Sequence, residues 1–389
     1  MKRLSLGLLV LVCGLGLLVG AHAYVAQRMV VEPGIADPWR TLALCGIALG
    51  ALSLVLQPMG ERWLELPASR CIAWPASLWM GFAFLVLVQL LASDALLWLA
   101  GSVARAATGS SVEPGATAGV RAALVAGVAL VAGAMALRNG LAPPQVERVE
   151  IALSRWPHAL DGLRIVQISD VHIGPILGRN FAAHVTERVN ALRPDLIAVT
   201  GDLADGSAEQ LAAEVAPFSA LAAPLGVFFV VGNHDHYSGA RAWAAKAADL
   251  GMRVLRNERV SLEARGEHFD LVGVDDHRGD IFGADGGEDL DAALAGRDMR
   301  LPALLLAHDP STFKRAHADG IDLQLSGHTH GGQIFPFHWF VRAVIPFVAG
   351  RYRCGDAELY VSRGTGFWGP PMRLGSPAEI TEIVLRAPH

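Results

Sequence analysis

The chain shows two hydrophobic patterns, and the change between them occurs near residue 138. Before that point, long and nearly unbroken apolar stretches are separated by short polar loops. A helix rises about 1.5 Å per residue, so each stretch is long enough to cross roughly 30 Å of hydrocarbon. The pattern therefore predicts an all-α transmembrane region over residues 1–137. Its four predicted spans are residues 5–25, 41–57, 73–100 and 120–137.

Two of these stretches allow more than one interpretation. The third contains Pro75 and Asp94, which indicates a kinked span or a span followed by an interfacial turn. We expect Asp94 to face the bundle or the interface, although an ionisable residue at this depth can also be functional. The first stretch follows Lys2 and Arg3 and ends near "AHA" (21–23), as a cleavable signal peptide does. Its apolar core of about 17 residues exceeds the usual ~7–15, which favours a retained span.

Basic residues beside the spans bear on orientation, because cytoplasmic loops carry an excess of Lys and Arg. The balance favours a multi-pass protein of the cell membrane with its C-terminal region in the cytoplasm. The two sets are Lys2, Arg3, Arg62, Arg70, Arg138 and Arg148 on the cytoplasmic side, and Arg28, Arg40, Arg105 and Arg121 on the other.

Beyond residue 160, short apolar runs alternate with amphipathic stretches. The preceding segment, residues 138–160, begins "RNGLAPPQVERVE" and is typical of an exposed linker. Apolar residues on both parities of the short runs indicate strands buried on both faces, so residues 161–389 are predicted to form an α/β domain. The predicted strands are 163–169, 195–201, 226–232, 269–275, 303–308, 322–327, 358–364 and 379–385. The predicted helices are 180–192, 207–222, 239–250 and 310–319.

Charge and cysteine content argue against nucleic-acid binding and against cysteine-based structure. Residues 151–389 carry 22 basic and 29 acidic residues, so no nucleic-acid partner is expected, because such a surface needs clustered positive charge. The four cysteines are scattered, which indicates neither a disulfide framework nor a thiolate metal site.

Metal-ligating residue types stand directly after several predicted strands. Open α/β sheets build their sites at the carboxyl ends of strands, and residues two apart leave a strand on the same side. Glycines at 201, 232 and 327 precede three of these positions and permit a sharp exit from the strand. The residues are Asp170, His172, Asp202, Asn233, His308, His328 and His330.

Each motif is weak alone, but D-x-H, G-D, G-N-H-D, a post-strand His and G-H-x-H occur in this order over 161 residues. In this combination the sequence resembles the calcineurin-like metallophosphoesterases over residues 162–332. The resemblance implies a four-layer α/β/β/α sandwich with a two-metal centre. It extends more loosely to residue 385 through "GHTHGGQIFP" and "LYVSRGTGFWGPPMRLG", which are similar to a membrane-associated branch that includes lipid pyrophosphatases.

The resemblance also implies a role for each of these positions. Asp170, His172 and His330 would bind one metal ion, Asn233, His308 and His328 the other, and Asp202 would bridge them. His234 would protonate the leaving group, and Asp205 would orient His234.

Nitrogen and oxygen ligands without thiolate suit two divalent ions of Mn, Fe or Zn. With two carboxylates in the set, the loaded centre keeps a positive charge that attracts phosphate. The chemistry implied is attack of a metal-bound hydroxide, with His234 as general acid.

Two further features bear on the substrate. Arg363 and Arg373 flank "GTGFWGPPM" and could bind a second phosphate. The apolar stretch 334–348 follows the last implied ligand and is either a buried element or an apolar lip beside the site.

The predicted function is a membrane-anchored hydrolase of lipid-linked phosphoesters or pyrophosphates, with the lipid bilayer as its partner. The alternatives are a phosphodiesterase or phosphatase acting on soluble nucleotides or proteins, and a non-catalytic membrane sensor or scaffold that retains the fold.

Overall fold

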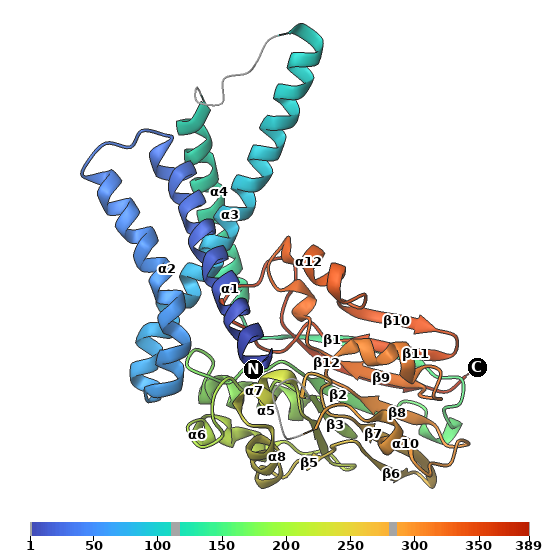
Figure 1. The fold of residues 1–389 in the computed structure, drawn as a ribbon. Helices are drawn as coiled ribbons and strands as arrows, with labels where there is room; N and C mark the ends of the chain where they lie inside the picture. Colours follow the sequence, from blue (N-terminus) through green and yellow to red (C-terminus); the bar gives the residue numbers. More distant parts are fainter. Residues whose placement is uncertain (1, 110–116, 280–285, 389) are drawn as a thin grey trace. The chain divides into compact units, whose positions relative to one another are not determined.

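The computed structural model describes the backbone of residues 2–109, 117–279 and 286–388 (Figure 1). The side chains of Lys2 and Arg3, which enter the predicted orientation, lie outside the described part. Contacts divide the chain into two units. The first comprises Met1–Leu137 with Gly369–Pro371, and the second comprises Arg138–Trp368 with Met372–His389.

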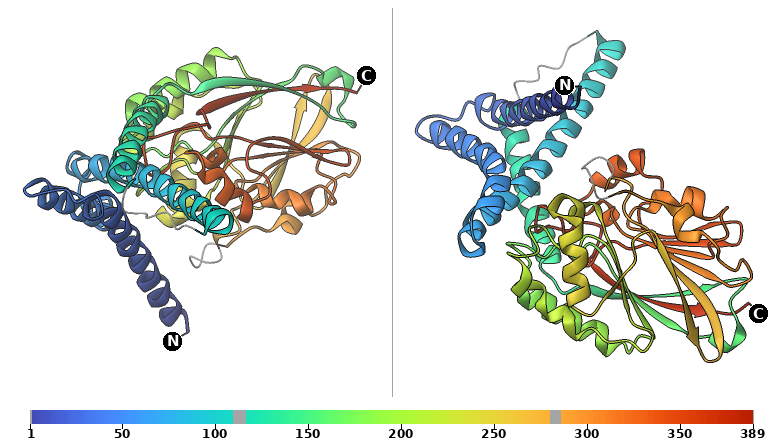
Figure 2. Two further views of the ribbon diagram at one scale, coloured as in Figure 1. Left: turned by 90° about the horizontal axis from the view of Figure 1, so that it is seen from above. Right: turned by 60° about the horizontal axis from the view of Figure 1, so that its bottom comes forward.

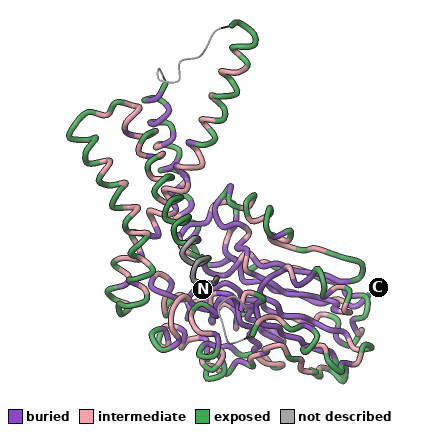
Figure 3. The backbone as a smooth tube through the Cα atoms, viewed as in Figure 1, coloured by how far each residue is buried: buried purple, intermediate pink, exposed green. Residues whose placement is uncertain are grey.

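The first unit consists of long apolar helices. Among the described residues, four helical segments are long and apolar enough to cross a membrane. Many of their large apolar side chains, such as Leu17, Trp98 and Val131, are exposed, and the helices are largely green in Figure 3. Such surfaces suit hydrocarbon as solvent. The helices are α1 (Lys2–Ala26), continued by the π-helical turn η1 (Gln27–Val31), α2 (Trp39–Trp63), α3 (Leu66–Thr108) and α4 (Ala118–Gly140).

Helix α3 is longer than the stretch predicted from hydropathy. Its 43 residues correspond to about 65 Å at 1.5 Å per residue, roughly twice the hydrocarbon thickness. Pro75 lies inside the helix, and the helix continues past Asp94 to Thr108. Of the two interpretations of this stretch, the structure has one continuous helix rather than a span followed by a turn.

Asp94 lies in a compact group of charged side chains within this unit. It accepts a hydrogen bond from the Tyr24 hydroxyl (2.6 Å) and pairs with Arg28 (2.7 Å) and Arg121 (2.5 Å). Arg121 also pairs with Glu32 (2.8 Å). Asp94 therefore faces the other helices, as expected, and two arginines balance two carboxylates in the group. Such compensation is the usual condition for charge at membrane depth.

The second unit contains two mixed sheets, each of six strands in the described part of the chain (Figures 1 and 2). The first sheet has the order β1-β12-β2-β3-β4-β5 and the second β10-β11-β9-β8-β7-β6. The strands of the first sheet are β1 (Gln145–Ala152), β12 (Glu379–Arg386), β2 (Arg164–Ile168), β3 (Leu196–Thr200), β4 (Val227–Val230) and β5 (Arg253–Val254). Those of the second are β10 (Gly350–Cys354), β11 (Ala357–Val361), β9 (Leu323–Ser326), β8 (Ala303–Leu306), β7 (Glu267–Gly273) and β6 (Glu258–Ala264).

Alternate residues of the central strands form the core between the sheets. Leu196 and Ala198 of β3 pack in one cluster with Leu304 and Leu306 of β8, because side chains two apart share a face. The intervening residues face outward, so these strands are apolar on both parities. Gln167 is the polar member of this layer, and its amide donates to the Thr200 hydroxyl and the Ser326 carbonyl. The bond to Ser326 therefore joins the two sheets near the end of β9.

Helices cover the outer faces of the sheets, which confirms the predicted α/β/β/α sandwich (Figure 2). Helix α5 agrees closely with the predicted 180–192 and α8 with the predicted 239–250, whereas the predicted 207–222 and 310–319 are divided into shorter segments. Pro217 is the second residue of a 3₁₀ turn inside the predicted 207–222. The segments are α5 (Arg179–Ala191), α6 (Ala212–Val215), η4 (Ala216–Ala220), α7 (Asn233–Ser238), α8 (Ala240–Asp249), α10 (Leu290–Leu294), η5 (Pro310–Thr312) and α11 (Phe313–Ala316).

Strand β1 lies within the segment expected to be a linker. It pairs in parallel with β12 from Gln145 to Ala152. It is an edge strand whose alternating side chains are mostly exposed, so its charged sequence lacks the apolar run that marks a central strand. The edge strands β5, β6 and β10 escaped the sequence analysis for the same reason.

Candidate metal centre

The seven implied ligands all lie at the carboxyl ends of strands, and both sheets contribute. Asp170 and His172 follow β2, Asp202 follows β3, and Asn233 begins α7 after β4. His308 follows β8, and His328 and His330 follow β9. Residues from two sheets therefore meet at one edge of the sandwich. This is the edge at which α/β proteins build their sites.

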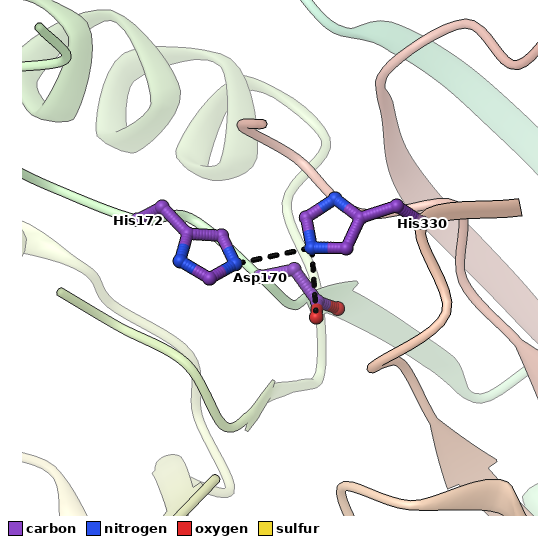
Figure 4. Close-up of side chains that lie close together, drawn as sticks. All are labelled: Asp170, His172 and His330. Atoms are coloured by element: carbon purple, nitrogen blue, oxygen red, sulfur yellow. Dashed lines mark hydrogen bonds and ion pairs between the residues drawn. The ribbon is translucent and has the colours of Figure 1, made fainter. Parts of the chain in front are cut away.

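Three of these side chains form the first group (Figure 4). The Nε2 atoms of His172 and His330 are 3.1 Å apart, and His330 Nε2 is 3.5 Å from Asp170 Oδ1. All three residues are buried. Their ligand atoms point at a common position and could hold one cation.

A second group lies beside the first. His308 Nε2 is 3.1 Å from Asn233 Oδ1 and 3.2 Å from His328 Nδ1. Asp202 Oδ2 is 3.2 Å from His308 Nε2 and 3.8 Å from His172 Nε2. Asp202 therefore stands between the groups, where one carboxylate could serve two cations.

The backbone at the ligands is unusual. Asp170, His172, Asp202, His328 and His330 have φ between 50° and 72°, a left-handed conformation that is uncommon outside glycine. Such residues concentrate at functional sites, because the surrounding structure must hold them in place. In this centre the left-handed backbone directs each of these side chains away from its strand and toward the other ligands of its group.

Close approach explains the glycine of the G-H-T-H motif. A Cβ atom at Gly327 would collide with the Ser169 hydroxyl and the Asp170 carboxylate. The same proximity lets the His328 amide donate to Asp170 Oδ1 at 2.9 Å. Gly327 thus allows the second sheet to approach the first at the centre.

Burial and neighbouring charges shift the pKa values of the imidazoles. Burial, with the nearby charge of His308, lowers the pKa of His328 to about 3. Burial and the charge of His172 also hold the pKa of His330 well below its usual range. Both rings are therefore neutral at pH 7, the form in which imidazole binds a metal. Burial opposes protonation of His308 as well, but the Asp202 carboxylate raises its pKa, so a cation bound there would displace a proton.

The donor set fits two divalent cations. It combines imidazole nitrogens with carboxylate and amide oxygens, and the cysteines of the chain are exposed elsewhere. These donors suit Mn, Fe or Zn. The negative charges of the buried Asp170 and Asp202 are only partly compensated by the other ligands. Cations would supply the missing positive charge.

Comparison with known proteins agrees with this geometry. The profile of the family described as "Calcineurin-like phosphoesterase" matches residues 163–332, which contain all seven side chains. The chain is 40% identical over 303 residues to a Bos taurus protein named "Transmembrane protein with metallophosphoesterase domain", covering 75% of this chain and 67% of that one. A Danio rerio protein of the same name is 34% identical over 361 residues, covering 90% and 80%.

The chain belongs to the calcineurin-like phosphoesterase family. An uncharacterised metallophosphoesterase of Bacillus subtilis is 32% identical over 281 residues, covering 69% of this chain and 96% of that protein. Among solved structures, a dimetal phosphatase from Danio rerio matches 54% of this chain and 90% of its own with a TM-score of 0.39 and 14% identity. The names of the transmembrane relatives, together with the four apolar helices, support membrane localisation.

In this phosphoesterase unit, His234 and Asp205 lie beside the first group. Asp205 Oδ1 accepts hydrogen bonds from Nδ1 of His234 (2.8 Å) and Nδ1 of His172 (2.9 Å). Burial lowers the pKa of His234, but the charges of Asp202 and Asp205 outweigh it and raise the pKa to about 9. The Asp205 carboxyl is partly buried, which raises its pKa, yet His172 and His234 outweigh this effect and hold its pKa well below its usual range. One ionised carboxylate therefore orients both a candidate ligand and a protonated imidazole.

Two carboxylates that support the centre escaped the sequence analysis. Asp235 is buried and accepts from the amides of Gly232, Asp202 and Leu203. Burial and the Asp202 charge raise its pKa to about 7. Asp309 Oδ2 lies 3.7 Å from His328 Nε2, on the side of the ring away from the centre. The sequence signal is an Asp directly after a His in both cases. Asp235 follows the implied proton donor in "GNHD", and Asp309 follows an implied ligand in "AHD".

The two arginines proposed to contact substrate make other contacts in the structure. The Arg373 guanidinium is fully buried and donates to the carbonyls of Gly366 and Ser376. A direct contact with substrate would require these bonds to open. Arg363 is partly exposed and pairs with Glu379 (2.6 Å) and Glu147 (3.0 Å). It thereby joins the loop after β11 to strands β12 and β1.

Proposed function

We propose that the chain is a membrane-anchored hydrolase of phosphoesters or pyrophosphates that uses two metal ions and acts on lipid-linked substrates. The observation that carries this proposal is the convergence of seven ligand side chains from both sheets beside the His234–Asp205 pair. A sensor or scaffold that had lost turnover would have no need to keep these parts together.

The residues have complementary roles in this proposal. Two divalent cations, when bound, supply positive charge for the phosphate and a nucleophile generated from water. Asp170 and Asp202 set the charge of the centre. The charges of Asp202 and Asp205 raise the pKa of His234 to about 9, so its ring is protonated on both nitrogens; Nδ1 donates to Asp205, and Nε2 gives its proton to the departing oxygen. Asp205 also fixes the ring of His172, so one carboxylate orients both the proton donor and a residue that would hold the first cation.

Membrane anchoring and exposed aromatic side chains support a lipid-linked substrate. The Tyr237 and Trp368 rings lie 5.1 Å and 5.9 Å from the His234 ring, and both side chains are about half exposed. The leaving-group side of the centre therefore opens onto aromatic rather than charged surface. A nucleotide or phosphoprotein would gain more from basic side chains there.

Hydrolysis of a generic aryl phosphodiester with added Mn²⁺ tests the activity itself. The detergent-solubilised full-length protein should hydrolyse it, Asp202→Ala should lose at least 100-fold in rate, and the surface variant Asp298→Asn should retain the wild-type rate. An inactive wild type, or an unimpaired Asp202→Ala, would refute the proposal. A panel of lipid phosphates, lipid pyrophosphates and nucleotides then decides the substrate class. Preference for nucleotides would replace the lipid assignment while retaining the hydrolase.

A further inference from the structure

Helix α12 (Phe337–Val344) presents an unusual apolar surface on the phosphoesterase unit. The surrounding stretch 334–348 was expected either to be a buried element or to form an apolar lip. Every residue of α12 is at least partly exposed, so the buried alternative is wrong. The largest side chains are among the most exposed, with Trp339 at 62% and Val344 at 78%. Soluble surfaces rarely gather large apolar side chains in this way.

The sequence of α12 is that of a helix at a membrane interface. Phe337, Phe340 and Val344 are spaced i, i+3 and i+7 and therefore share one face. Arg342 lies away from that face. Aromatic residues on one side and a basic residue on the other are typical of helices that lie in the headgroup region.

Charge around the helix points to a lipid surface rather than to a basic partner. The chain has no Asp or Glu between Asp322 and Asp356, whereas Arg342, Arg351 and Arg353 fall in this interval. The phosphoesterase unit as a whole is acidic, so the interval is a local exception. Arg351 and Arg353 pair with Glu358, but Arg342 belongs to α12 itself, and α12 contains no carboxylate that would repel anionic lipids.

Chain connectivity keeps the phosphoesterase unit near a bilayer. Helix α4 ends at Gly140 and β1 begins at Gln145, and this connection spans at most about 15–20 Å when extended. Because α4 is one of the candidate membrane spans, the phosphoesterase unit stays within reach of the headgroups. Even weak apolar insertion is then effective, because binding occurs within one molecule.

The α12 surface is also linked to the candidate centre. Gln333, three residues after His330, makes two hydrogen bonds to the backbone of Trp368, through its amide and its carbonyl. Trp368 contacts His234, and Phe335, just beyond Gln333, packs against Trp339. The segment from Gln333 to Trp339, together with Trp368, therefore connects the helix to the proton donor.

We propose that the exposed side chains Phe335, Phe337, Trp339, Phe340 and Val344 form a membrane-docking surface that inserts into the interface of the bilayer in which the chain is anchored. Docking brings the leaving-group side of the centre to the lipid surface. Insertion does not require hydrolysis, so it stands apart from the proposed activity.

Depth-dependent fluorescence quenching tests this directly. The full-length protein, with its four cysteines replaced by Ser, carries Phe340→Cys labelled with bimane in vesicles of phosphatidylcholine and phosphatidylglycerol. Lipids with a nitroxide on the upper acyl chain should quench this label several-fold more than a label at Met299→Cys, an exposed apolar position outside the surface. Val344→Cys should behave like Phe340→Cys.

Two results would overturn the proposal. Equal quenching at positions 340 and 299 would show that the surface stays in water. Protection of position 340 from aqueous iodide without quenching by nitroxide lipids would show that protein, such as a second copy of the chain, covers it instead. Neither result depends on metal or substrate, so failure here is distinct from failure of the hydrolase proposal.

Discussion

His234 links the electrostatics of the centre to a measurable pH dependence. Its pKa is raised to about 9, because the charges of Asp202 and Asp205 outweigh burial. A general acid works in its protonated form, so the rate should be maintained below this pKa and fall as the pH rises through it. We expect His234→Asn to lower kcat by about 10²–10⁴-fold and to abolish this alkaline limb.

The matched comparison for this prediction is Asp205→Asn. It removes a charge that raises the pKa of His234, so the alkaline limb should move to lower pH rather than disappear. Profiles of kcat against pH for the three proteins provide the measurement. An unchanged alkaline limb in His234→Asn would show that another group supplies the proton.

The charged group of the helical unit leads to a prediction about how the helices are held together. Asp94 of α3 pairs with Arg121 of α4 and with Arg28 next to α1, so it joins three segments. Removal of one partner from a buried ion pair leaves an uncompensated charge, at a cost of about 3–5 kcal/mol. Asp94→Leu should therefore lower the thermal unfolding midpoint in detergent markedly.

The double variant Asp94→Leu with Arg121→Leu is the informative control. It removes one charge of each sign and leaves the Arg28–Glu32 pair, which is 2.7 Å apart. We expect it to recover much of the stability lost in Asp94→Leu. A double variant less stable than both single variants would show that the four charges do not act as one compensated group.

Elements differ in how far their sequence reveals them. The central strands and α5 were predictable, because burial on one or both faces imposes a regular apolar pattern on them. Edge strand β1 was not, since half of its side chains are polar and Ile151 alone is buried. The break of the predicted helix 207–222 at Pro217 depends on how the chain packs after α5, which hydropathy alone does not show.

The candidate centre was predictable where each residue follows directly on a strand. The ends of parallel strands meet at one edge, so the order of motifs along the chain already placed the seven side chains together. The supporting residues Asp235 and Asp309 differ, because nothing in a local sequence shows whether a carboxylate turns inward. The exposure of α12 was likewise open, because its apolar sequence suits a core helix and an interfacial helix equally well.

At the scale of the whole molecule, two units of different character occur in one chain. The helical unit is apolar on its exposed surface, and the phosphoesterase unit has a polar, charged centre between two sheets. A short connection links the unit that carries the candidate metal centre to the last candidate membrane span. The helical unit thus explains membrane localisation, and the second unit explains both the family and the α/β fold.

The proposed hydrolase requires that the two groups of side chains act as a pair of metal sites. The metal content of the full-length protein, purified after equilibration with Mn²⁺, measures this most directly. We predict about two equivalents per chain in the wild type and in His317→Ala, and about one in either His308→Ala or His330→Ala. A wild type that binds less than one equivalent, or retention of two equivalents in both ligand variants, would contradict a two-metal centre at these residues.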